Sequence, residues 1–317
     1  MNRNIEEWKI SIIGAGTMGL SLALFYAMNG HEVKLYNRTA ENLEKAKTQI
    51  ISSYYTLVGM GVMELEDIVK VTSRISYFTD LKQAAEDADY VIESVSENKE
   101  IKKGIFAKLD EYCTNECILA SNTSTFNIYE FVKVSNLKRL VITHYLNPPH
   151  ITPLVEIVRG EDTSDECVDT LKEFFTHVGK YPIVLNKCVE GFLWNRLQMA
   201  LGREATYLVD EGLATVEDID IAMKKGLAPR YLLRGIFSMY DFNGIDVLNA
   251  VFNSTFPTLC NADSAPFCIT DKVSKGELGV KTKKGFNDYT EKDISEVISD
   301  GEEKLISIVK YAKNNIW

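Results

Sequence analysis

A histidine and a glutamate lie twelve residues apart near the middle of the chain, and both residue types can move protons. His144 ends an apolar run, and Glu156 is the central residue of Leu-Val-Glu-Ile-Val. Burying that carboxylate is costly unless a donor pairs with it, and a histidine N–H would pair with it while fixing the ring's tautomer. The spacing therefore predicts an oriented general base. The alternative is a solvated glutamate on an edge strand and an unrelated histidine in a loop.

The composition limits the classes of protein to which the chain can belong. Its 317 residues suffice for two domains, and 45% hydrophobic with 25% charged residues is a globular composition. A net charge of −10 argues against nucleic acid or an anionic membrane as a partner. There is no run of about 18 apolar residues, no apolar signal-peptide core, and no metal-ligand or disulfide spacing among the six cysteines. We expect a cytoplasmic protein without a metal centre.

A glycine-rich segment near the start of the chain is typical of a dinucleotide-binding turn. A short apolar run at 9–13 leads directly into Gly14-Ala-Gly16-Thr17-Met18-Gly19, and a helical pattern follows up to Asn29-Gly30. A strand, a GxGxxG turn and a helix in this order allow the backbone to approach a pyrophosphate at the helix N-terminus. We therefore expect residues 14–19 to bind NAD(P). A glycine-rich turn without a ligand is the alternative.

The residues after the next strand bear on the choice between the two dinucleotides. Sites for NAD carry Asp or Glu there to bind the ribose 2′-OH, whereas this chain has Asn37-Arg38-Thr39. Asn37 removes a carboxylate that would repel a 2′-phosphate, and Arg38 can pair with that phosphate. The pattern favours NADP. The alternative is that Arg38 stacks on the adenine or faces water while NAD binds.

Further polar residues lie at or just after the ends of two more predicted strands, at 89–95 and 118–124. In a doubly wound sheet the carboxyl ends of the strands face the ligand crevice, so we expect Glu97, Lys102, Asn122 and Ser124 to line it. Read singly, each of them is as typical of a helix cap or a turn.

The second half of the chain changes to helical patterns. A long amphipathic helix is predicted from Gly191 to Gly212, and Thr215-Val-Glu-Asp218 is a capping box for the next one. We predict an N-terminal Rossmann-type α/β domain, 1–187, and an all-helical C-terminal domain, 188–317. The large apolar side chains of those helices indicate either a buried core or a homodimer interface.

These motifs together resemble the L-3-hydroxyacyl-CoA dehydrogenase family along nearly the whole chain. The matching segments, in order, are GAGTMG at 14–19, ESVSENKEIKKGIFAKLD at 93–110, SNTS at 121–124, HYLNPPHITPLVEIV at 144–158, GFLWNRL at 191–197, VDEGLATVEDIDIAMKKGL at 209–227 and ELGVKTKKGFNDYT at 277–290. The resemblance implies a dehydrogenase that oxidises a secondary alcohol by removing the O–H proton while hydride leaves for nicotinamide.

The resemblance also implies roles for individual residues. His144 resembles the family's general base, Glu156 the carboxylate that orients it, and Ser124 and Asn195 the groups that hydrogen-bond the reacting oxygen. Glu97 and Lys102 match positions near the nicotinamide ribose, and Asn122 matches one near the carboxamide. Asn147 and Arg230 are candidate substrate-binding residues.

Two kinds of substrate remain open. Acyl-CoA members of the family commonly carry basic residues in the helical excursion after the second strand, and residues 54–67 here have none. Gly226-Leu-Ala-Pro-Arg230-Tyr resembles the branch that acts on free hydroxy acids (gulonate 3-dehydrogenase, lambda-crystallins and carnitine dehydrogenase), where an arginine can bind a carboxylate. Residues 238–248 and the lysines at 281, 283 and 284 resemble the acyl-CoA branch.

Two other classes of protein share some of these features. The β-hydroxyacid dehydrogenases related to 6-phosphogluconate dehydrogenase share the glycine loop but use a catalytic lysine on the helix that starts the second domain. The segment from Gly191 to Gly212 contains no lysine, which argues against them. A non-catalytic, crystallin-like NADPH-binding protein is the other alternative, and retention of Ser124, His144, Glu156 and Asn195 argues for activity.

Overall fold

The computed structural model describes residues 4–317, which divide into two compact units. Unit 1 ends at Asn195 and unit 2 runs from Arg196 to Trp317. The sequence placed the boundary at residue 187, directly after the last strand. In the structure residues 188–195, which follow that strand, still belong to unit 1, and Phe192 is fully buried in its hydrophobic core. The first three residues of the predicted N-terminal domain lie outside the described residues.

Unit 1 is built on one sheet of eight strands in the order β3-β2-β1-β4-β5-β6-β7-β8. The strands are β1 (Ile10–Ile13), β2 (Val33–Tyr36), β3 (Ile75–Phe78), β4 (Tyr90–Glu93), β5 (Ile118–Ser121), β6 (Leu140–Tyr145), β7 (Leu154–Arg159) and β8 (Tyr181–Leu185). Neighbouring strands from β3 to β6 are parallel, β7 is antiparallel to β6, and β8 is parallel to β7. The strand order reverses between β1 and β4, which is where such sheets bind ligands.

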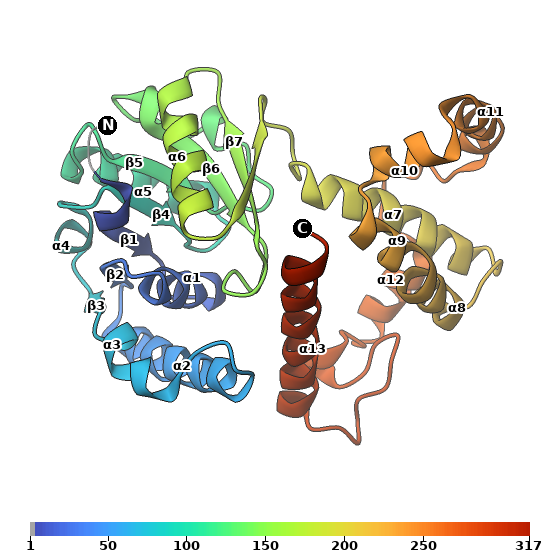
Figure 1. Ribbon diagram of the computed structural model, residues 1–317, viewed down its shortest axis with the longest axis horizontal. Coiled ribbons are helices and arrows are strands. Elements are labelled where there is room, and N and C mark those ends of the chain that lie inside the picture. The colour runs from blue at the N-terminus through green and yellow to red at the C-terminus, as the bar shows by residue number, and fades with distance from the viewer. Residues whose placement is uncertain (1–3) are drawn as a thin grey trace. The chain divides into compact units, whose positions relative to one another are not determined.

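Helices cover both faces of this sheet. The helices of unit 1 are α1 (Thr17–Met28), α2 (Ala40–Gly59), α3 (Ile68–Thr72), α4 (Leu81–Ala85), α5 (Lys99–Tyr112) and α6 (Asp165–His177). On one face, Tyr26 of α1 and Phe174 of α6 pack against Tyr90 of β4; Figure 1 shows α6 crossing in front of β6 and β7. On the other face, Phe106 of α5 packs in one core with Val91 of β4. The predicted Rossmann-type α/β domain is confirmed.

The pairing of β6 with β7 decides where the two proton-moving residues lie. His144 is directly opposite Glu156 in the antiparallel register. Side chains of directly opposed residues point to the same face of a sheet, and a slip by one residue would send one of them to the other face. The register therefore brings the imidazole and the carboxylate side by side.

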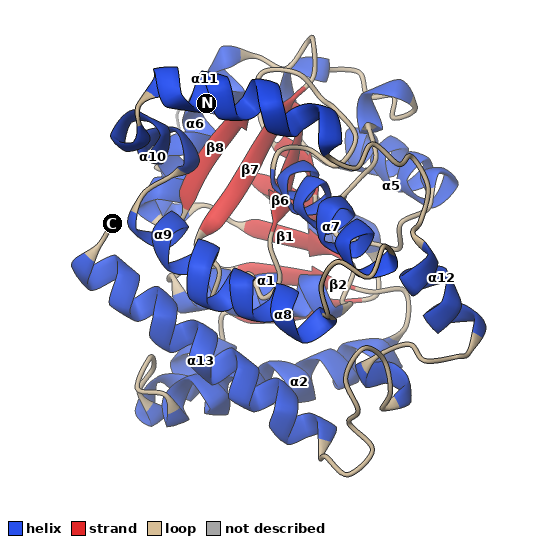
Figure 2. Cartoon of the chain, turned by 90° about the vertical axis from the view of Figure 1, so that its right-hand side faces the viewer, coloured by secondary structure: helices blue, strands red, loops and turns tan. Residues whose placement is uncertain are grey.

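Unit 2 consists of helices joined by loops, together with two isolated β-bridges near residues 279–288. Its helices, blue in Figure 2, are α8 (Val216–Ile221), a π-helical segment (Ala222–Leu227), α9 (Ala228–Leu233), α10 (Ile236–Asn243), α11 (Ile245–Thr255), α12 (Phe267–Ser274) and α13 (Ile294–Asn315). Thr215 caps α8 by accepting a hydrogen bond from the backbone N–H of Asp218, as predicted. None of the helices within residues 4–317 has the length and apolar character needed to cross a bilayer.

The helix that leads into unit 2, α7 (Trp194–Asp210), begins later than the sequence predicted. Gly191 and Phe192 have φ values of 76° and 50°, in the left-handed region, so they cannot form the first turn of an α-helix. The prediction of a helix from Gly191 was therefore wrong by about one turn. The later start leaves the backbone N–H groups of Leu193 and Trp194 free of the helix, and they bind Glu156 instead.

Candidate active site

The turn between β1 and α1 is shaped by two glycines that no other residue could replace without movement. Gly14 has φ of +118°, and a Cβ there would lie 2.4 Å from the carbonyl oxygen of Ser94. A Cβ on Gly19 would lie 1.8 Å from the carbonyl oxygen of Gly14. Because neither residue has a Cβ, the turn can lie directly against the end of β4 and α1 can lie close to β1, as a dinucleotide-binding turn requires.

The N-terminus of α1 opens onto a pocket. Gly16 is the N-cap residue and provides no side chain to satisfy the first backbone N–H groups of the helix. A Cβ on Gly16 would meet no atom within 4 Å, so a ligand can approach the backbone there. The pocket is lined by Gly14, Ala15, Gly16, Tyr36, Asn37, Arg38, Asn42, Ser94, Val95, Ser96, Ile101 and Ile105. The residues present fit a dinucleotide, with its pyrophosphate at the helix N-terminus.

The end of β2 supplies the predicted Asn37 and Arg38 to the wall of this pocket. The Asn37 side-chain oxygen accepts weak hydrogen bonds from the backbone N–H of Thr39 (3.3 Å) and from the Asn42 side chain (3.4 Å). Arg38 is exposed. Thr39 is the N-cap residue of α2, with no hydrogen bond from its side chain to the helix.

His144 and Glu156 form a buried pair. Nδ1 of His144 lies 2.5 Å from Oε2 of Glu156, and the two residues are 5% and 0% exposed. The carboxylate only accepts hydrogen bonds, so Nδ1 carries the proton. The other ring nitrogen, Nε2, is then the unprotonated one and can accept a proton from a substrate.

The second oxygen of Glu156 is held by the N-terminus of α7. Oε1 accepts hydrogen bonds from the backbone N–H groups of Leu193 (2.9 Å) and Trp194 (2.8 Å). The left-handed turn at Gly191 and Phe192 makes this possible because it delays the helix until those N–H groups point at the carboxylate. The Phe192 ring also packs edge-on against the His144 ring, with centroids 5.4 Å apart. Glu156 is thus fixed on both oxygens, which orients the imidazole.

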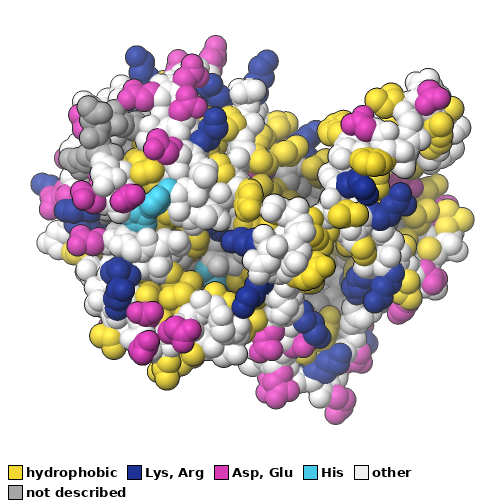
Figure 3. Space-filling model, in the orientation of Figure 1, with side chains coloured by type: hydrophobic (Ala, Val, Ile, Leu, Met, Phe, Trp, Pro, Cys, Tyr) yellow, Lys and Arg dark blue, Asp and Glu magenta, His cyan; other side chains and the backbone are white. Residues whose placement is uncertain are grey.

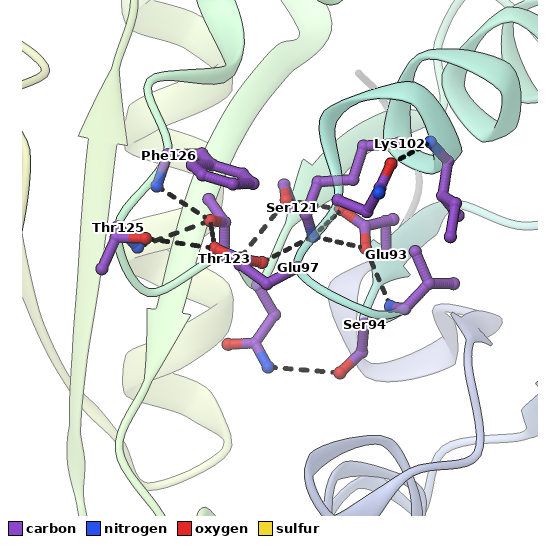
Figure 4. Close-up of polar contacts among 12 residues, drawn as sticks. Glu93, Ser94, Glu97, Lys102, Ser121, Thr123, Thr125 and Phe126 are labelled. Atoms are coloured by element: carbon purple, nitrogen blue, oxygen red, sulfur yellow. Dashed lines mark hydrogen bonds and ion pairs between the residues drawn. The ribbon is translucent and has the colours of Figure 1, made fainter.

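A second group of charged residues lies at the carboxyl end of β4. The Lys102 ammonium, 1% exposed, contacts both oxygens of Glu93 at 2.8 and 3.0 Å and Oε2 of Glu97 at 3.1 Å. Glu93 is fully buried and also accepts hydrogen bonds from the Ser121 hydroxyl (2.6 Å) and the Val95 N–H (2.8 Å). Figure 4 shows these residues converging from β4, β5 and α5. Glu97, by contrast, is 36% exposed in its side chain, so it can contact a ligand.

The turn after β5 connects this group to the histidine. The Asn122 side-chain oxygen accepts a hydrogen bond from the backbone N–H of Tyr145, next to His144, at 3.1 Å. Ser124 is exposed, and its carbonyl oxygen accepts a hydrogen bond from the Asn195 side chain at 3.0 Å. The structure therefore brings Ser124 and Asn195 together through the Ser124 backbone.

Of the two predicted substrate residues, one is in a loop of unit 1 and the other is in a helix of unit 2. Asn147 is exposed at the start of the loop between β6 and β7. The ammonium of the buried Lys180 fixes that loop by donating hydrogen bonds to the carbonyl oxygens of Pro149 and Thr152. Arg230 is an exposed residue of α9 in unit 2.

The sequence reading missed three residues that hold the site together: Glu93, Thr123 and Phe192. Glu93 gave a signal, because it is a carboxylate in the last position of an otherwise apolar strand, and burial there requires a cation. Thr123, 1% exposed, lies inside the motif SNTS, where a threonine gives no sign of burial. Nothing in the local pattern distinguished Phe192 from an ordinary helix residue.

Comparison with known proteins agrees with this geometry. The model of the 3-hydroxyacyl-CoA dehydrogenase NAD binding domain matches residues 9–188, and that of the 3-hydroxyacyl-CoA dehydrogenase C-terminal domain matches residues 191–289. The chain belongs to the 3-hydroxyacyl-CoA dehydrogenase family. Its NAD-binding domain and its relatives make it an NAD-dependent oxidoreductase.

Relatives with different named substrates match most of the chain. 5-Formyl-3-hydroxy-2-methylpyridine 4-carboxylate 5-dehydrogenase of Mesorhizobium japonicum is 30% identical over 300 residues, covering 94% of this chain and 96% of the relative. A probable 3-hydroxybutyryl-CoA dehydrogenase of Bacillus subtilis is 34% identical over 290 residues, covering 91% and 99%. The crystal structure of a 5-dehydrogenase of the first kind, described as an NAD⁺-dependent dismutase, superposes with a TM-score of 0.87 at 29% identity, covering 97% and 99%.

Proposed function

We propose that the protein reversibly oxidises the 3-hydroxyl group of an L-3-hydroxyacyl-CoA substrate to the 3-keto product. The observation that supports this most is the buried His144–Glu156 pair, in which Glu156 is fixed on both oxygens and Nε2 of His144 is the unprotonated nitrogen. Such a pair is a general base with a defined tautomer. The turn that carries Ser124 supplies a hydroxyl donor at the same end of the sheet.

The proposed roles follow from these contacts. Nε2 of His144 removes the proton of the substrate hydroxyl, and Glu156 stabilises the imidazolium that forms. The side chains of Ser124 and Asn195 hydrogen-bond the reacting oxygen as negative charge develops on it. The bound nicotinamide supplies the hydride acceptor. Glu97 binds the nicotinamide ribose, Lys102 supports it, and Asn122 contacts the carboxamide.

The experiment that tests this assignment is His144→Gln. We expect turnover to fall below detection while the cofactor still binds, measured as fluorescence of bound reduced nicotinamide. His177→Gln, the same substitution at an exposed histidine of α6, is the matched control and should leave kcat unchanged. Turnover in His144→Gln close to that of the control would refute His144 as the base.

For the cofactor we infer that the site accepts NADP as well as NAD, with a preference for NADP. Asn37 stands where a carboxylate would repel a 2′-phosphate, and the exposed Arg38 lines the same pocket. We expect a lower KM for NADPH than for NADH, and Asn37→Asp should reverse the order. A wild-type preference for NADH would refute this inference, and the NAD⁺-dependent relative makes the measurement necessary.

A second candidate substrate is a free hydroxy acid, with Arg230 binding its carboxylate. Two observations favour it: the relative that acts on a pyridine carboxylate matches 94% of the chain, and the segment after α2 carries Glu64, Glu66 and Asp67, with no basic residue, where CoA phosphates would need cations. Reduction of acetoacetyl-CoA measured beside oxidation of gulonate and carnitine, with both cofactors, separates the two. Arg230→Gln should raise KM only for the free acids.

The homodimer and the cytoplasmic location remain predictions. Hydrophobic side chains gather over α10 and α11 in Figure 3, and the most exposed of them are Phe237 (79%), Phe242 (71%) and Ile245 (66%). We propose that a second copy covers this patch, since monomers rarely expose so much apolar surface. Light scattering should give a dimer mass that Phe237→Glu lowers to that of a monomer.

A crystallin-like protein without activity is the remaining alternative. In that case none of the substrates would be turned over, although NADPH would still bind.

A further inference from the structure

The turn that carries Ser124 is tied together by a buried hydroxyl. Thr123 is 1% exposed, and its Oγ1 accepts hydrogen bonds from the backbone N–H groups of Phe126 (3.1 Å) and Thr125 (3.4 Å). The same hydroxyl donates to Oε1 of Glu97. Figure 4 shows Thr123 between these partners. With two acceptor positions and one donor position used, the hydroxyl is fully satisfied.

Both groups proposed to bind the reacting oxygen are attached to this turn. Ser124 follows Thr123 directly, and its carbonyl oxygen accepts the hydrogen bond from the Asn195 side chain at 3.0 Å. A change in the backbone of the turn would therefore move the Ser124 hydroxyl and the Asn195 amide together.

The other end of the network is anchored in the core. Glu97 is bound by Lys102, and Lys102 is bound by the fully buried Glu93. Two carboxylates share one ammonium, so the Thr123 hydroxyl supplies Glu97 with a donor on the oxygen that Lys102 does not bind. Because Glu93 and Lys102 are 0% and 1% exposed, this anchor is held away from water and fixes Glu97 relative to β4.

We propose that Thr123 is a positioning residue for the reaction: its hydroxyl holds the turn that places Ser124 and Asn195, and joins that turn to Glu97 on the cofactor side. The proposal rests on the roles proposed above for Ser124 and Asn195. A displacement of about 1 Å in such groups can lower a rate about 100-fold. The cofactor side and the substrate side of the site are then connected through the Thr123 hydroxyl, beside a longer hydrogen bond (3.4 Å) from the Thr125 hydroxyl to the same Glu97 oxygen.

The test is a double-mutant cycle of Thr123→Val with Ser124→Ala. Valine keeps the shape of threonine but removes the hydroxyl, so we expect kcat at saturating cofactor to fall about 10- to 100-fold. In the Ser124→Ala background the same change should lower kcat by a smaller factor than in wild type, because one of the two groups it positions is already gone. Thr123→Ser, which keeps the hydroxyl and removes only the methyl group, should keep kcat within about threefold of wild type.

A control separates positioning from loss of stability. Thr163 is 2% exposed, donates to the carbonyl oxygen of Leu140 (2.7 Å) and accepts from the N–H of Gly160 (2.9 Å), but lies away from the site. Thr163→Val should therefore lower the melting temperature about as much as Thr123→Val and leave kcat unchanged. An equal loss of kcat in both variants would overturn the proposal, as would an additive cycle.

Two further measurements keep the proposal open to refutation. If Thr123→Val does not fold, Thr123→Ala, which also removes the hydroxyl, takes its place in the cycle, and additivity with Ser124→Ala again refutes the connection. Crystal structures of wild type and Thr123→Val give the position of Ser124 without any assay. An unmoved Ser124 overturns the proposal. A displaced Ser124 in Thr123→Val, together with a wild type that turns over none of the substrates, instead shows that the proposed function is wrong.

Discussion

Glu156→Gln is the substitution that most sharply tests how the site is oriented. The two backbone N–H groups at the start of α7 require an acceptor, so the glutamine oxygen has to stay at the Oε1 position. The amide NH₂ then faces Nδ1 of His144. Because the amide donates, Nδ1 has to accept, and the imidazole proton moves to Nε2. The nitrogen that should remove the substrate proton is then already protonated.

The kinetic cost follows from the tautomer. A carboxylate-to-amide change beside a catalytic histidine, with the geometry kept, lowers kcat about 10⁴-fold in serine proteases. We expect kcat of Glu156→Gln to fall about 10³- to 10⁴-fold, which corresponds to about 4 to 5.5 kcal/mol of transition-state stabilisation. Cofactor binding should be unchanged, because neither Glu156 nor its hydrogen-bond partners His144, Leu193 and Trp194 line the dinucleotide pocket.

The thermodynamic cost is smaller. Glu156 is fully buried, and each of its two backbone hydrogen bonds loses about 1 kcal/mol when the acceptor becomes neutral. The free energy of unfolding should therefore fall by about 2 kcal/mol in urea titrations. Glu161→Gln, at an exposed position in the loop after β7, is the control for both measurements.

One result would refute this reasoning: a Glu156→Gln variant that folds, binds cofactor and keeps kcat within about tenfold of wild type.

Two more predictions concern the glycine turn and the loop beside His144. Gly16→Ala should keep the wild-type melting temperature, because its Cβ meets no atom within 4 Å, but weaken cofactor binding about tenfold or more. In Gly19→Ala the Cβ would lie 1.8 Å from the Gly14 carbonyl oxygen, so the melting temperature should fall as well. Equal melting temperatures of the two variants would contradict this explanation. Burial, with the nearby Lys180 ammonium, lowers the pKa of His150 from 6.5 to about 4. Between those pH values the unfolded chain binds more protons than the folded protein, so acid favours unfolding there. The free energy of unfolding should therefore be highest above about pH 6.5 and fall by about 2 kcal/mol between pH 7 and pH 5. Urea titrations of wild type and His150→Asn should differ in this slope, and parallel pH profiles would refute the assignment.

Local patterns carried most of the fold and part of the site. The strand, glycine turn and helix at 9–28 are recognisable from residue types alone, because backbone approach and helix capping depend on neighbours in sequence. The helix predicted from Gly191 failed for the opposite reason. Its first turn is displaced by the left-handed Phe192, whose ring is buried against His144, a contact made 48 positions away along the chain.

The sequence by itself determined the family and the α/β domain followed by helices, and it indicated that a histidine and a glutamate could pair. These follow from spacing and residue type, which persist in any conformation. Only the tertiary structure decided how the pair is oriented and what supports it. The β6–β7 register sets His144 opposite Glu156, and the start of α7 holds the carboxylate. The buried Glu93–Lys102 pair and Thr123 join strands and a helix that are distant in sequence. Hydrogen bonds between such segments depend on packing, which no local pattern encodes.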